Sequence, residues 1–288
     1  MDKRRPPLHY KILTDSCCDI PEEIQSWITR IPLYVTLGEK TLVDDGSWEP
    51  SVLLDEIAKS KAGPKSACPP PGVFTEYYAG PEQDVYLVTV SKEISGTYNS
   101  ALQGAKLYQE ENPGKNIHVF NSKTACAGQV LICEKVKELA ESGLPFAEVV
   151  TQTEAFIEKA NTMFVLEDLE ILRKSGRMSA LQSVITGKLK IKLVMGGTPE
   201  GTIAKITQAL SVTQALNKMV AIISEKAKKA SAGKIPKLVI SHCFARERAE
   251  YVKTKVKATC DVAETIICKS GGIGTMYANK GGIVVSFS

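Results

Sequence analysis

Hydroxyl-bearing residues lie between a predicted strand and a predicted helix in the N-terminal half of the chain. Ser95, Gly96 and Thr97 follow Val85–Val90, an apolar, β-branched segment without proline, and they open a helix predicted over 95–111. A turn of this kind leaves backbone N–H groups free beside the positive end of the helix dipole, and both attract an anion. Ser95 either donates to that anion or only caps the helix, while Gly96 lets a ligand approach the backbone.

Two other polar loops have similar chemistry. A proline-stiffened loop over residues 65–74 contains Ser66 and leads into a helix with Pro71 in its first turn. Nearer the N-terminus, the first predicted strand, Tyr10–Thr14, ends in the third loop. Because ligand sites gather at the carboxyl ends of parallel strands, we expect the three loops to converge. Besides Ser66 and Ser95, the loop residues expected to line the site are Thr14, Asp15, Ser16, Ala67 and Cys68.

The elements that position these loops alternate between strand and helix, which predicts an α/β domain with a mostly parallel sheet. The predicted strands are Tyr10–Thr14, Ile31–Leu37, Val85–Val90 and Ile117–Asn121. The predicted helices are Pro21–Thr29, Pro50–Ser60, Pro71–Ala79, Ser95–Glu111, Thr124–Glu141 and Phe146–Ala160. We assign residues 1–160 to this N-terminal domain, which carries the three loops.

The regular alternation of strands and helices ends in the second half of the chain. We interpret residues 161–288 as an α+β domain with a mixed sheet. Pro199, Glu200 and Gly201 predict a hairpin turn, and the glycines at 271–274 and 281–282 predict tight turns or close approach of the backbone to a ligand. The predicted strands are Thr162–Leu166, Lys188–Met195, Thr202–Thr207, Lys237–His242, Asp261–Cys268 and Ile283–Phe287. The predicted helices are Asp168–Lys174, Ser179–Thr186, Val212–Ala230 and Ala245–Lys257.

The composition is that of a globular protein with two cores. The chain has 288 residues, of which 43% are hydrophobic and 24% charged. It has no apolar run near 18 residues, so no membrane span is expected, and Met1–Leu8 lacks the apolar core of a signal peptide. We therefore expect a cytoplasmic protein. The net charge of +4 is mild and aromatic residues make up 6%, which argues against a nucleic-acid partner.

The cysteines and histidines favour neither a metal site nor a hydrolase. The eight cysteines include no Cys-x2-Cys pair, so we expect no metal and interpret most of them as buried free thiols. A redox role stays open for Cys17, Cys18 and Cys68, because they lie in the proposed site loops. Gly-x-Ser-x-Gly is absent, which disfavours a serine hydrolase.

The order of these motifs resembles the DegV family, whose members are bacterial fatty-acid-binding proteins that carry the acyl chain for fatty acid kinase. The resemblance extends from about Tyr10 to Phe287 and implies a two-domain, DegV-like α/β fold. The matching segments are Thr14-Asp15-Ser16, Asp19-Ile20-Pro21, Asp45-Gly46, Ser66 to Phe74, Ser95-Gly96-Thr97-Tyr98, Ser100-Ala101 and Leu169 to Ser179. The last of these resembles the family's Leu-x-x-Leu-x-Lys-Gly-Gly-Arg-Ile-Ser segment.

The resemblance also implies a ligand, a long-chain fatty acid similar to palmitate or stearate. Ser66 takes the place of the family's binding threonine, and Ser95, with Gly96 and Thr97, matches its Ser-Gly-Thr motif. The carboxylate would be held by hydroxyls and amides without a buried cation, and the tail would lie in an apolar tunnel. At roughly 0.8 kcal/mol per buried methylene, a sixteen-carbon chain gains about 10 kcal/mol, offset by several kcal/mol for association and ordering.

The implied function is that of a lipid carrier, with no catalytic activity and no cofactor besides its ligand, which presents the acid to a kinase subunit or another lipid enzyme. Three departures from the family pattern concern the kinase partnership. Ala67 and Cys68 replace two polar residues, and Lys205–Gln208 lacks the family's arginine. In the C-terminal segment Thr275 is kept, but Met276 stands in the family's histidine position. We expect Thr275 and Met276 to line the site.

A different class of function uses the same turns. A phosphotransferase or hydrolase could hold a small phosphorylated substrate there, with Asp15, Asp44 and Asp45 as candidate ligands for Mg²⁺. Aspartates also cap helices and turns, which is the structural alternative for all three. An apolar tunnel beside Ser95 would favour the lipid carrier, and a wet polar cleft would favour the enzyme.

Overall fold

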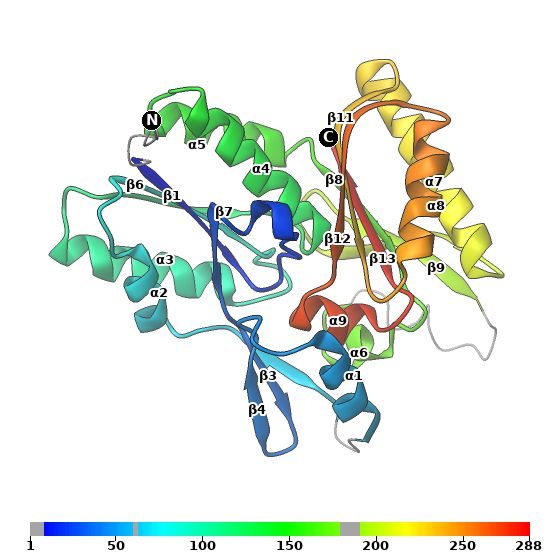
Figure 1. Ribbon diagram of the computed structural model, residues 1–288, viewed down its shortest axis with the longest axis horizontal. Helices are drawn as coiled ribbons and strands as arrows, with labels where there is room; N and C mark the ends of the chain where they lie inside the picture. Colours follow the sequence, from blue (N-terminus) through cyan, green and yellow to red (C-terminus); the bar gives the residue numbers. More distant parts are fainter. Residues whose placement is uncertain (1–8, 60–62, 179–190) are drawn as a thin grey trace, which may run out of the picture.

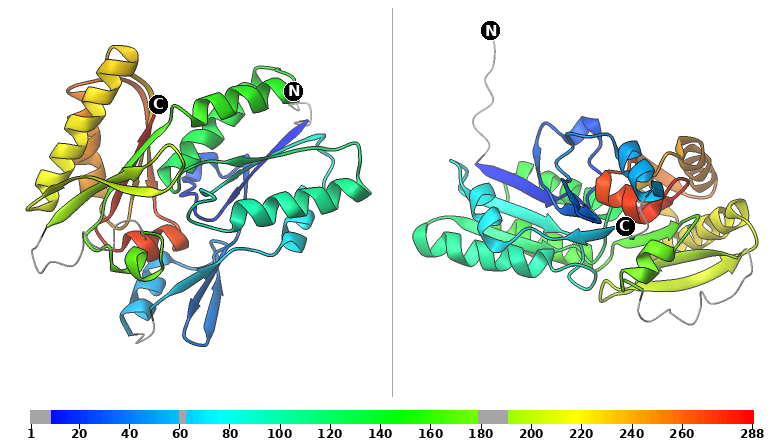
Figure 2. Two further views of the ribbon diagram at one scale, coloured as in Figure 1. Left: turned by 180° about the vertical axis from the view of Figure 1, so that it is seen from behind. Right: turned by 90° about the horizontal axis from the view of Figure 1, so that it is seen from below.

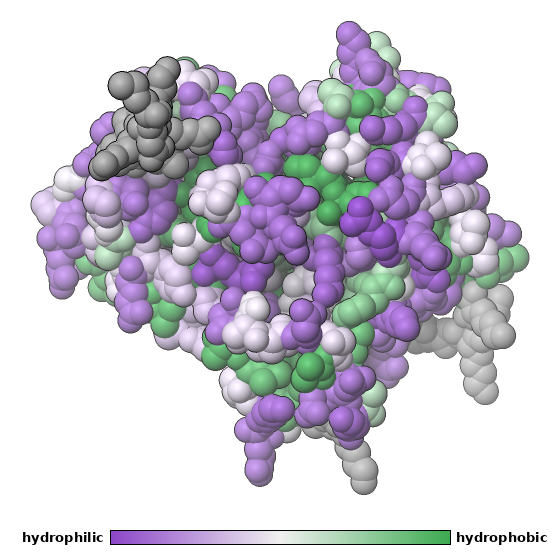
Figure 3. All heavy atoms as spheres, viewed as in Figure 1, coloured by the Kyte–Doolittle hydropathy of each residue, from purple (hydrophilic) through white to green (hydrophobic). Residues whose placement is uncertain are grey.

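The computed structural model describes residues 9–59, 63–178 and 191–288 (Figure 1). Within these residues the strands form a four-stranded, a six-stranded and a three-stranded sheet. Hydrophilic residues cover most of the face seen in Figure 3, and apolar residues gather there in smaller groups. Among the described helices, none combines the length and the apolar character that crossing a membrane requires.

The four-stranded sheet is parallel throughout, as the α/β pattern predicts. Its order is β2 (Ile28–Ile31), β1 (Tyr10–Asp15), β6 (Asp84–Thr89), β7 (Asn116–Asn121). Helices α2 (Pro71–Tyr78) and α3 (Thr97–Glu111) lie on one face, and α4 (Ala127–Glu141) and α5 (Phe146–Ile157) lie on the other (Figure 1). Leu13 and Leu87 are buried against α2 and α3, while Ile12 and Tyr86 are buried against α4. Both faces are therefore apolar, as buried parallel strands require.

The three-stranded sheet is an addition that the sequence analysis did not predict. It is antiparallel, in the order β4 (Lys40–Val43), β3 (Tyr34–Leu37), β5 (Lys65–Ala67), and α1 (Pro50–Lys59) lies beside it (Figure 1). The single strand predicted over Ile31–Leu37 is wrong. Pro32, which has no N–H to donate, separates β2 from β3.

The predicted helix Pro21–Thr29 is also wrong. A short 3-10 turn, Glu22–Ile24, precedes β2, which pairs with β1 through Ile28 opposite Ile12. Pro21 followed by two glutamates is a pattern typical of the start of a helix. The β-branched residues of Ile28–Ile31 instead fill the edge of the parallel sheet, so tertiary pairing overrides the local signal.

The six-stranded sheet is mixed, as predicted. Its order is β10 (Ile203–Ala209), β9 (Lys192–Gly197), β8 (Asn161–Val165), β13 (Ile283–Phe287), β11 (Lys234–His242), β12 (Asp261–Lys269). Within the described part of this sheet, β11–β12 is the one parallel pair, and the other pairs are antiparallel. Helices α7 (Val212–Ser231) and α8 (Arg246–Lys257), yellow and orange in Figure 2, cover one face, and α4 packs against β11 and β13 on the other.

The predicted hairpin between β9 and β10 is confirmed. Gly201 N–H donates to the carbonyl of Thr198 at 2.9 Å, and Gly201 has a φ of +97°. Ser91 Oγ donates to the carbonyl of Gly201 at 2.8 Å, so the hairpin turn rests on the loop after β6. The helix predicted over 179–186 and the start of the strand predicted from 188 lie outside the described residues. The described strand begins at Lys192.

A helix, α9 (Gly272–Ala278), forms where the glycines had predicted tight turns or close approach of the backbone to a ligand. Asp19 accepts a hydrogen bond from Gly271 N–H and Asp44 accepts one from Ile273 N–H, both at 2.9 Å. These carboxylates satisfy N–H groups that a helix start leaves free. A Cβ on Gly272 would clash with the Asp44 carboxylate, so the glycines do allow close approach, to aspartates of the N-terminal region.

Several cores cross the proposed domain boundary. Cys17, Leu33 and Leu53 share one apolar cluster with Ile273 and Met276 of α9. Helix α4 packs against strands of both large sheets, β1 and β6 on one side and β11 and β13 on the other. The division into residues 1–160 and 161–288 stays a prediction, to be tested by limited proteolysis and by expression of each half.

Candidate functional site

A pocket lies where the loops of the parallel sheet, α9 and the edge of the mixed sheet meet. The space between its lining atoms, which includes open solvent at the mouth, is about 920 Å³. Most of the lining side chains are apolar: Leu33, Val90, Ile94, Phe164, Leu166, Leu172, Ile203, Ile273, Ala278 and Val284. The polar lining residues therefore mark positions where a ligand's polar groups can bind.

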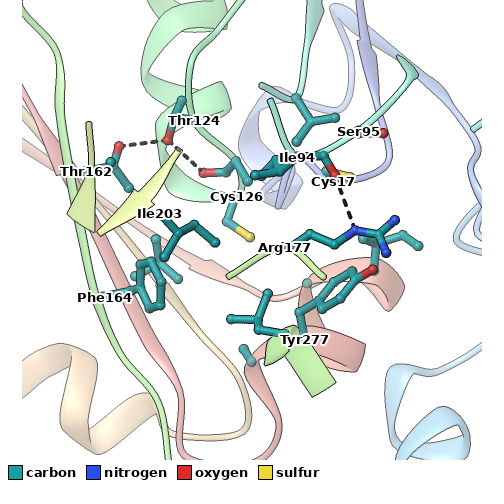
Figure 4. A pocket seen from close by; sticks show the side chains of 18 of the residues that line it. Cys17, Ile94, Ser95, Thr124, Cys126, Thr162, Phe164, Arg177, Ile203 and Tyr277 are labelled. Carbon is teal, nitrogen blue, oxygen red and sulfur yellow. Dashed lines mark hydrogen bonds between the residues drawn. The ribbon is translucent and has the colours of Figure 1, made fainter. Parts of the chain in front are cut away.

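Polar side chains gather at two separate places in this pocket (Figure 4). Ser95, Arg177 and Tyr277 lie on one side of the view, and Thr124 and Thr162 lie on the opposite side. Phe164, Ile203 and other apolar side chains line the space between them. Two polar places separated by an apolar space suit an elongated molecule. The sequence analysis predicted the first of these polar places in part and did not predict the second.

Ser95 lines the pocket and also accepts a hydrogen bond from the first residue of the helix behind it. Helix α3 begins at Thr97, two residues later than predicted. Ser95 Oγ accepts a hydrogen bond from Thr97 N–H at 3.3 Å and lies 2.8 Å from Thr97 Oγ1. If Thr97 donates its hydroxyl proton to Ser95, the Ser95 proton is free for a ligand. Thr97 itself is buried outside the pocket lining, and Gly96 lines a shallow polar recess with Ser95 and Arg177.

Ser66 reaches the same pocket from strand β5. Side chains alternate along a strand, so Ser66 faces inward, opposite Val35 of β3, while Ala67 is exposed. Ser66 Oγ lies 2.9 Å from the hydroxyl oxygen of Tyr277. Ala67 and Cys68 are not among the residues lining the pocket, although Cys68 is half-buried near Gly96. Strand β5 thus brings only one of its predicted residues into the site.

The residues predicted at the end of β1 lie beneath the pocket. Asp15 accepts hydrogen bonds from Val90 N–H at 2.6 Å and Cys17 N–H at 3.0 Å, so it joins the ends of β1 and β6. Burial raises the pKa of Asp15, and these hydrogen bonds oppose that shift. Thr14 Oγ1 donates to the carbonyl of Val88, and Ser16 Oγ accepts from Leu33 N–H. These contacts give Thr14, Asp15 and Ser16 a supporting role.

The three aspartates considered for Mg²⁺ bind separate backbone groups. Asp44 is buried and holds Ile273 N–H, while Asp45 is exposed and accepts from Ser47 N–H at 2.8 Å. Burial raises the pKa of Asp44, and the hydrogen bonds with Ser47 lower the pKa of Asp45. Over residues 9–59, 63–178 and 191–288 no group of three or more His, Cys, Asp or Glu has the geometry to hold a metal ion.

Helix α9 contributes a site residue that the sequence analysis missed. Met276 is buried in the shared apolar cluster and Thr275 is buried beside Cys243, so neither lines the pocket. Tyr277 does line it, together with Ile273 and Gly274. These positions share one face of a helix. No helical face was considered because the glycines had been interpreted as turns.

Arg177 is the second residue that was missed as a ligand contact. Its Nε donates to the carbonyl of Ile94 at 3.3 Å, and its Nη1 donates to the carbonyl of Ser175 at 2.6 Å. It follows α6 (Glu170–Lys174) and lines both the pocket and the recess at Ser95. A cation thus lies beside the turn that was predicted to bind an anion, where only hydroxyls and amides had been expected. The sequence contained a clue to this residue, because Arg177 lies in the segment Leu169 to Ser179, which resembles a motif of the family.

Hydroxyl groups close the opposite end of the pocket. Thr124 Oγ1 donates to Thr162 Oγ1 at 2.8 Å, Thr162 Oγ1 lies 3.1 Å from Ser286 Oγ, and Ser286 donates to the carbonyl of Asn161. A polar pocket lies behind this wall and shares Lys123, Thr124, Thr162 and Gly197 with the first. The hydroxyls satisfy one another, so the wall needs no polar partner from a ligand.

Two thiols also line the pocket. Burial raises the pKa of Cys17 and of Cys126 well above the ordinary thiol value, so both are protonated at neutral pH. Their backbones are joined, because Cys126 N–H donates to the carbonyl of Cys17 at 3.0 Å. Protonated thiols behave as small apolar groups. They therefore add to the apolar wall between the two polar ends.

Known proteins share both the sequence pattern and the fold. Residues 9–288 match the family described as "Uncharacterised protein, DegV family COG1307". A DegV-family crystal structure from Ruminococcus gnavus, refined with vaccenic acid, is 39% identical with a TM-score of 0.92, covering 97% of this chain and 99% of that one. The Fatty Acid Kinase (Fak) B3 protein of Streptococcus pneumoniae, loaded with linoleic acid, is 28% identical with a TM-score of 0.87 and the same coverage.

A curated relative extends this agreement. The DegV domain-containing protein of Streptococcus gordonii is 28% identical over 282 residues, which cover 96% of this chain and 98% of that protein. The α/β fold, with one parallel sheet and one mixed sheet, is the fold of the DegV structures. From the match over residues 9–288 we conclude that the chain belongs to the DegV family.

Proposed function

We propose that the protein binds one long-chain fatty acid in the pocket beside Ser95. The carboxylate lies at Ser95, Ser66 and Arg177, and the acyl tail runs along the apolar lining to the wall of Thr124 and Thr162. The observation that carries this proposal is an apolar pocket whose polar groups gather at two ends and whose mouth holds a cation.

The chemistry of the two ends supports this orientation. Hydroxyl donors and a guanidinium at Ser95, Ser66 and Arg177 suit a carboxylate, because charge-assisted hydrogen bonds are the strong ones. The hydroxyls of Thr124 and Thr162 are already satisfied and so accept an apolar chain end. Each methylene buried between them contributes about 0.8 kcal/mol, so the tail supplies most of the affinity. Relatives named as loaded with linoleic or vaccenic acid agree with this assignment.

The role that fits such a site is that of a lipid carrier without catalytic activity. A carrier hides the acyl chain from water and presents the carboxylate at the mouth, where a kinase subunit or another lipid enzyme reaches it. The relative from Streptococcus pneumoniae is named as a protein of fatty acid kinase. Met276 is buried, so the position where the family pattern has a histidine offers no polar group for phosphoryl transfer.

The alternative of a phosphotransferase or hydrolase has less support. Its substrate would need a wet, polar cleft beside Ser95. The pocket that Ser95 shares with Ser66 and Tyr277 is mainly apolar, and the polar recess on the other side of Ser95 is shallow and open. Its metal would need converging carboxylates, whereas Asp15 and Asp44 bind the backbone N–H groups of different segments.

Extraction and a pocket-filling variant test the proposal. We expect organic solvent to release acyl chains, detected by mass spectrometry, from protein purified under native conditions. Ile203→Trp fills the pocket, so protein with this change should release no acyl chains. Ile206→Trp lies on the same strand but outside this pocket, so protein with that change should still release them. Protein that carries no acyl chain and takes up no added palmitic acid would refute the proposal.

A further inference from the structure

The hydroxyls of Tyr277 and Ser66 meet at the polar end of the pocket, although 211 residues separate them in the chain. Their oxygens lie 2.9 Å apart, and both side chains line the pocket. In the part of the chain that the structure describes, each hydroxyl has the other as its one protein hydrogen-bond partner. The pair is therefore satisfied without a ligand and has capacity left to bind one.

We propose that Tyr277 is a positioning residue, which orients the hydroxyl of Ser66 toward the ligand's carboxylate. This inference rests on the proposed function. Each hydroxyl has one proton, so the pair has two arrangements. If Ser66 donates to Tyr277, its proton is occupied and its lone pairs face the carboxylate. If Tyr277 donates to Ser66, the proton of Ser66 is free for the carboxylate.

The chemistry of the two hydroxyls favours the second arrangement. A phenol is a better proton donor than an aliphatic alcohol. A hydroxyl that accepts a hydrogen bond also becomes a better donor, because bonds in such a chain polarise one another. A carboxylate accepts only, so it selects the state in which Tyr277 donates to Ser66 and Ser66 donates to the ligand.

The structure holds Tyr277 firmly enough for this role. Asp19 and Asp44 hold the start of α9 through Gly271 N–H and Ile273 N–H. One turn later Met276 is buried in the shared apolar cluster, which fixes the rotation of the helix about its axis. The next residue, Tyr277, therefore faces the pocket. Its ring is part of the apolar wall, and its hydroxyl lies at the polar end.

Tyr277→Phe is a sharp test, because it keeps the ring and removes only the hydroxyl. We compare the affinities of each protein for palmitic acid and for 1-hexadecanol, which has the same chain without the charge. We expect Tyr277→Phe to lose about fivefold in affinity for the acid, the net value of one hydrogen bond between neutral groups, because Ser66 is then neither oriented nor polarised by the phenol. The loss for the alcohol should be less than twofold. Tyr251→Phe, which removes a hydroxyl bonded to Asn217 outside the pocket, is the matched control.

A double-mutant cycle with Ser66→Ala separates positioning from a direct contact. If Tyr277 acts through Ser66, the double variant binds palmitic acid as Ser66→Ala does, since the second change removes nothing further. Additive losses, or equal losses for acid and alcohol in Tyr277→Phe, would overturn the inference. Unaltered binding by Tyr277→Phe, with wild-type binding intact, overturns it also. A wild-type protein that binds no palmitic acid instead refutes the proposed function.

Discussion

The Nε of Arg177 donates to the carbonyl oxygen of Ile94 at 3.3 Å, across 83 residues of sequence. This bond joins the segment after α6 to the turn before α3, and it places a positive charge beside Ser95 at the mouth of the pocket. A carboxylate bound there meets a guanidinium as well as hydroxyls.

Arg177→Gln should therefore weaken the binding of palmitic acid by about tenfold or more, because a charge-assisted contact is lost. The loss should shrink at high salt, since a half-exposed charge is screened, and 1-hexadecanol should bind as before. Titration of both ligands at two salt concentrations measures this. Arg173→Gln, an exposed residue of α6, is the control. Equal palmitic acid affinities for wild type and Arg177→Gln would contradict the proposed orientation of the ligand.

Ser95→Ala should weaken palmitic acid binding more than Ser66→Ala does. Only Ser95 lies at the start of a long helix, where free N–H groups and the helix dipole favour an anion. Isothermal titration of both variants gives the comparison, with Ser142→Ala at the exposed end of α4 as the control. Wild-type affinity in both variants would exclude this turn as the carboxylate site.

The wall of Thr124 and Thr162 should limit the length of the acyl chain. Thr162→Ile adds bulk at the end of the pocket, so stearic acid should lose more affinity than myristic acid. Each displaced methylene costs about 0.8 kcal/mol, or roughly fourfold in affinity. Competition with a fluorescent fatty acid measures the ratio. Thr151→Ile, exposed on α5, controls for the change of residue. An unchanged ratio would mean that the chain ends elsewhere.

The raised pKa of the buried Asp19 carboxyl predicts that the stability of the protein depends on pH. Burial raises the pKa of Asp19 to about 6, opposed by the hydrogen bond from Gly271 N–H. Between about pH 4 and 6 the folded state binds more protons at this group than the unfolded state. The contribution of Asp19 to the free energy of unfolding therefore falls as the pH rises through this window, by about 3 kcal/mol.

Urea unfolding of wild type and Asp19→Asn at pH 4, 5, 6 and 7 tests this contribution. Asp15 and Asp44 also have raised pKa values, and both proteins retain them. The charge of Asp44 contributes to the raised pKa of Asp19, so the difference between the two proteins reports Asp19 together with this interaction. The stability of wild type relative to Asp19→Asn should decline toward pH 7. A difference that stays constant with pH would show that Asp19 does not titrate in this range.

Gly201→Ala should destabilise the protein by about 1–3 kcal/mol. Gly201 has a φ of +97°, and a Cβ there would lie 2.9 Å from Lys123 Cα and clash with Ser91 Oγ. Gly143→Ala, at a φ of +79° with open space around it, has the backbone strain without the clash. Thermal unfolding of both variants separates the two costs. Equal losses would mean that the hairpin moves away from Ser91 easily.

The sequence predicts much of the fold because its buried strands are locally distinctive. Val85–Val90 and Ile117–Asn121 are apolar, β-branched and followed by polar loops, and each forms a strand close to the predicted bounds. Ser66 and Ser95 were also predicted to share one site, and both line the pocket. The local sequence pattern predicts a strand correctly where both faces of the sheet are buried, because such burial allows few other conformations.

The parts that were missed depend on partners far away in the chain. Helix α9 has glycines at its start, which disfavour a helix on local propensity, and its free N–H groups are satisfied by Asp19 and Asp44, more than two hundred residues earlier. Without α9 there was no reason to assign Tyr277 to the pocket. The strand β5 likewise exists only because β3 lies beside it.

The position of α9 links ligand occupancy to the integrity of the whole molecule. Its covalent neighbours are β12 and β13, yet its first turn is anchored by side chains from the opposite end of the polypeptide. Neither the N-terminal nor the C-terminal half can unfold alone without removing residues that line one side of the pocket. A ligand in this pocket would contact residues from both halves, so saturation with palmitic acid should raise the temperature at which the protein unfolds.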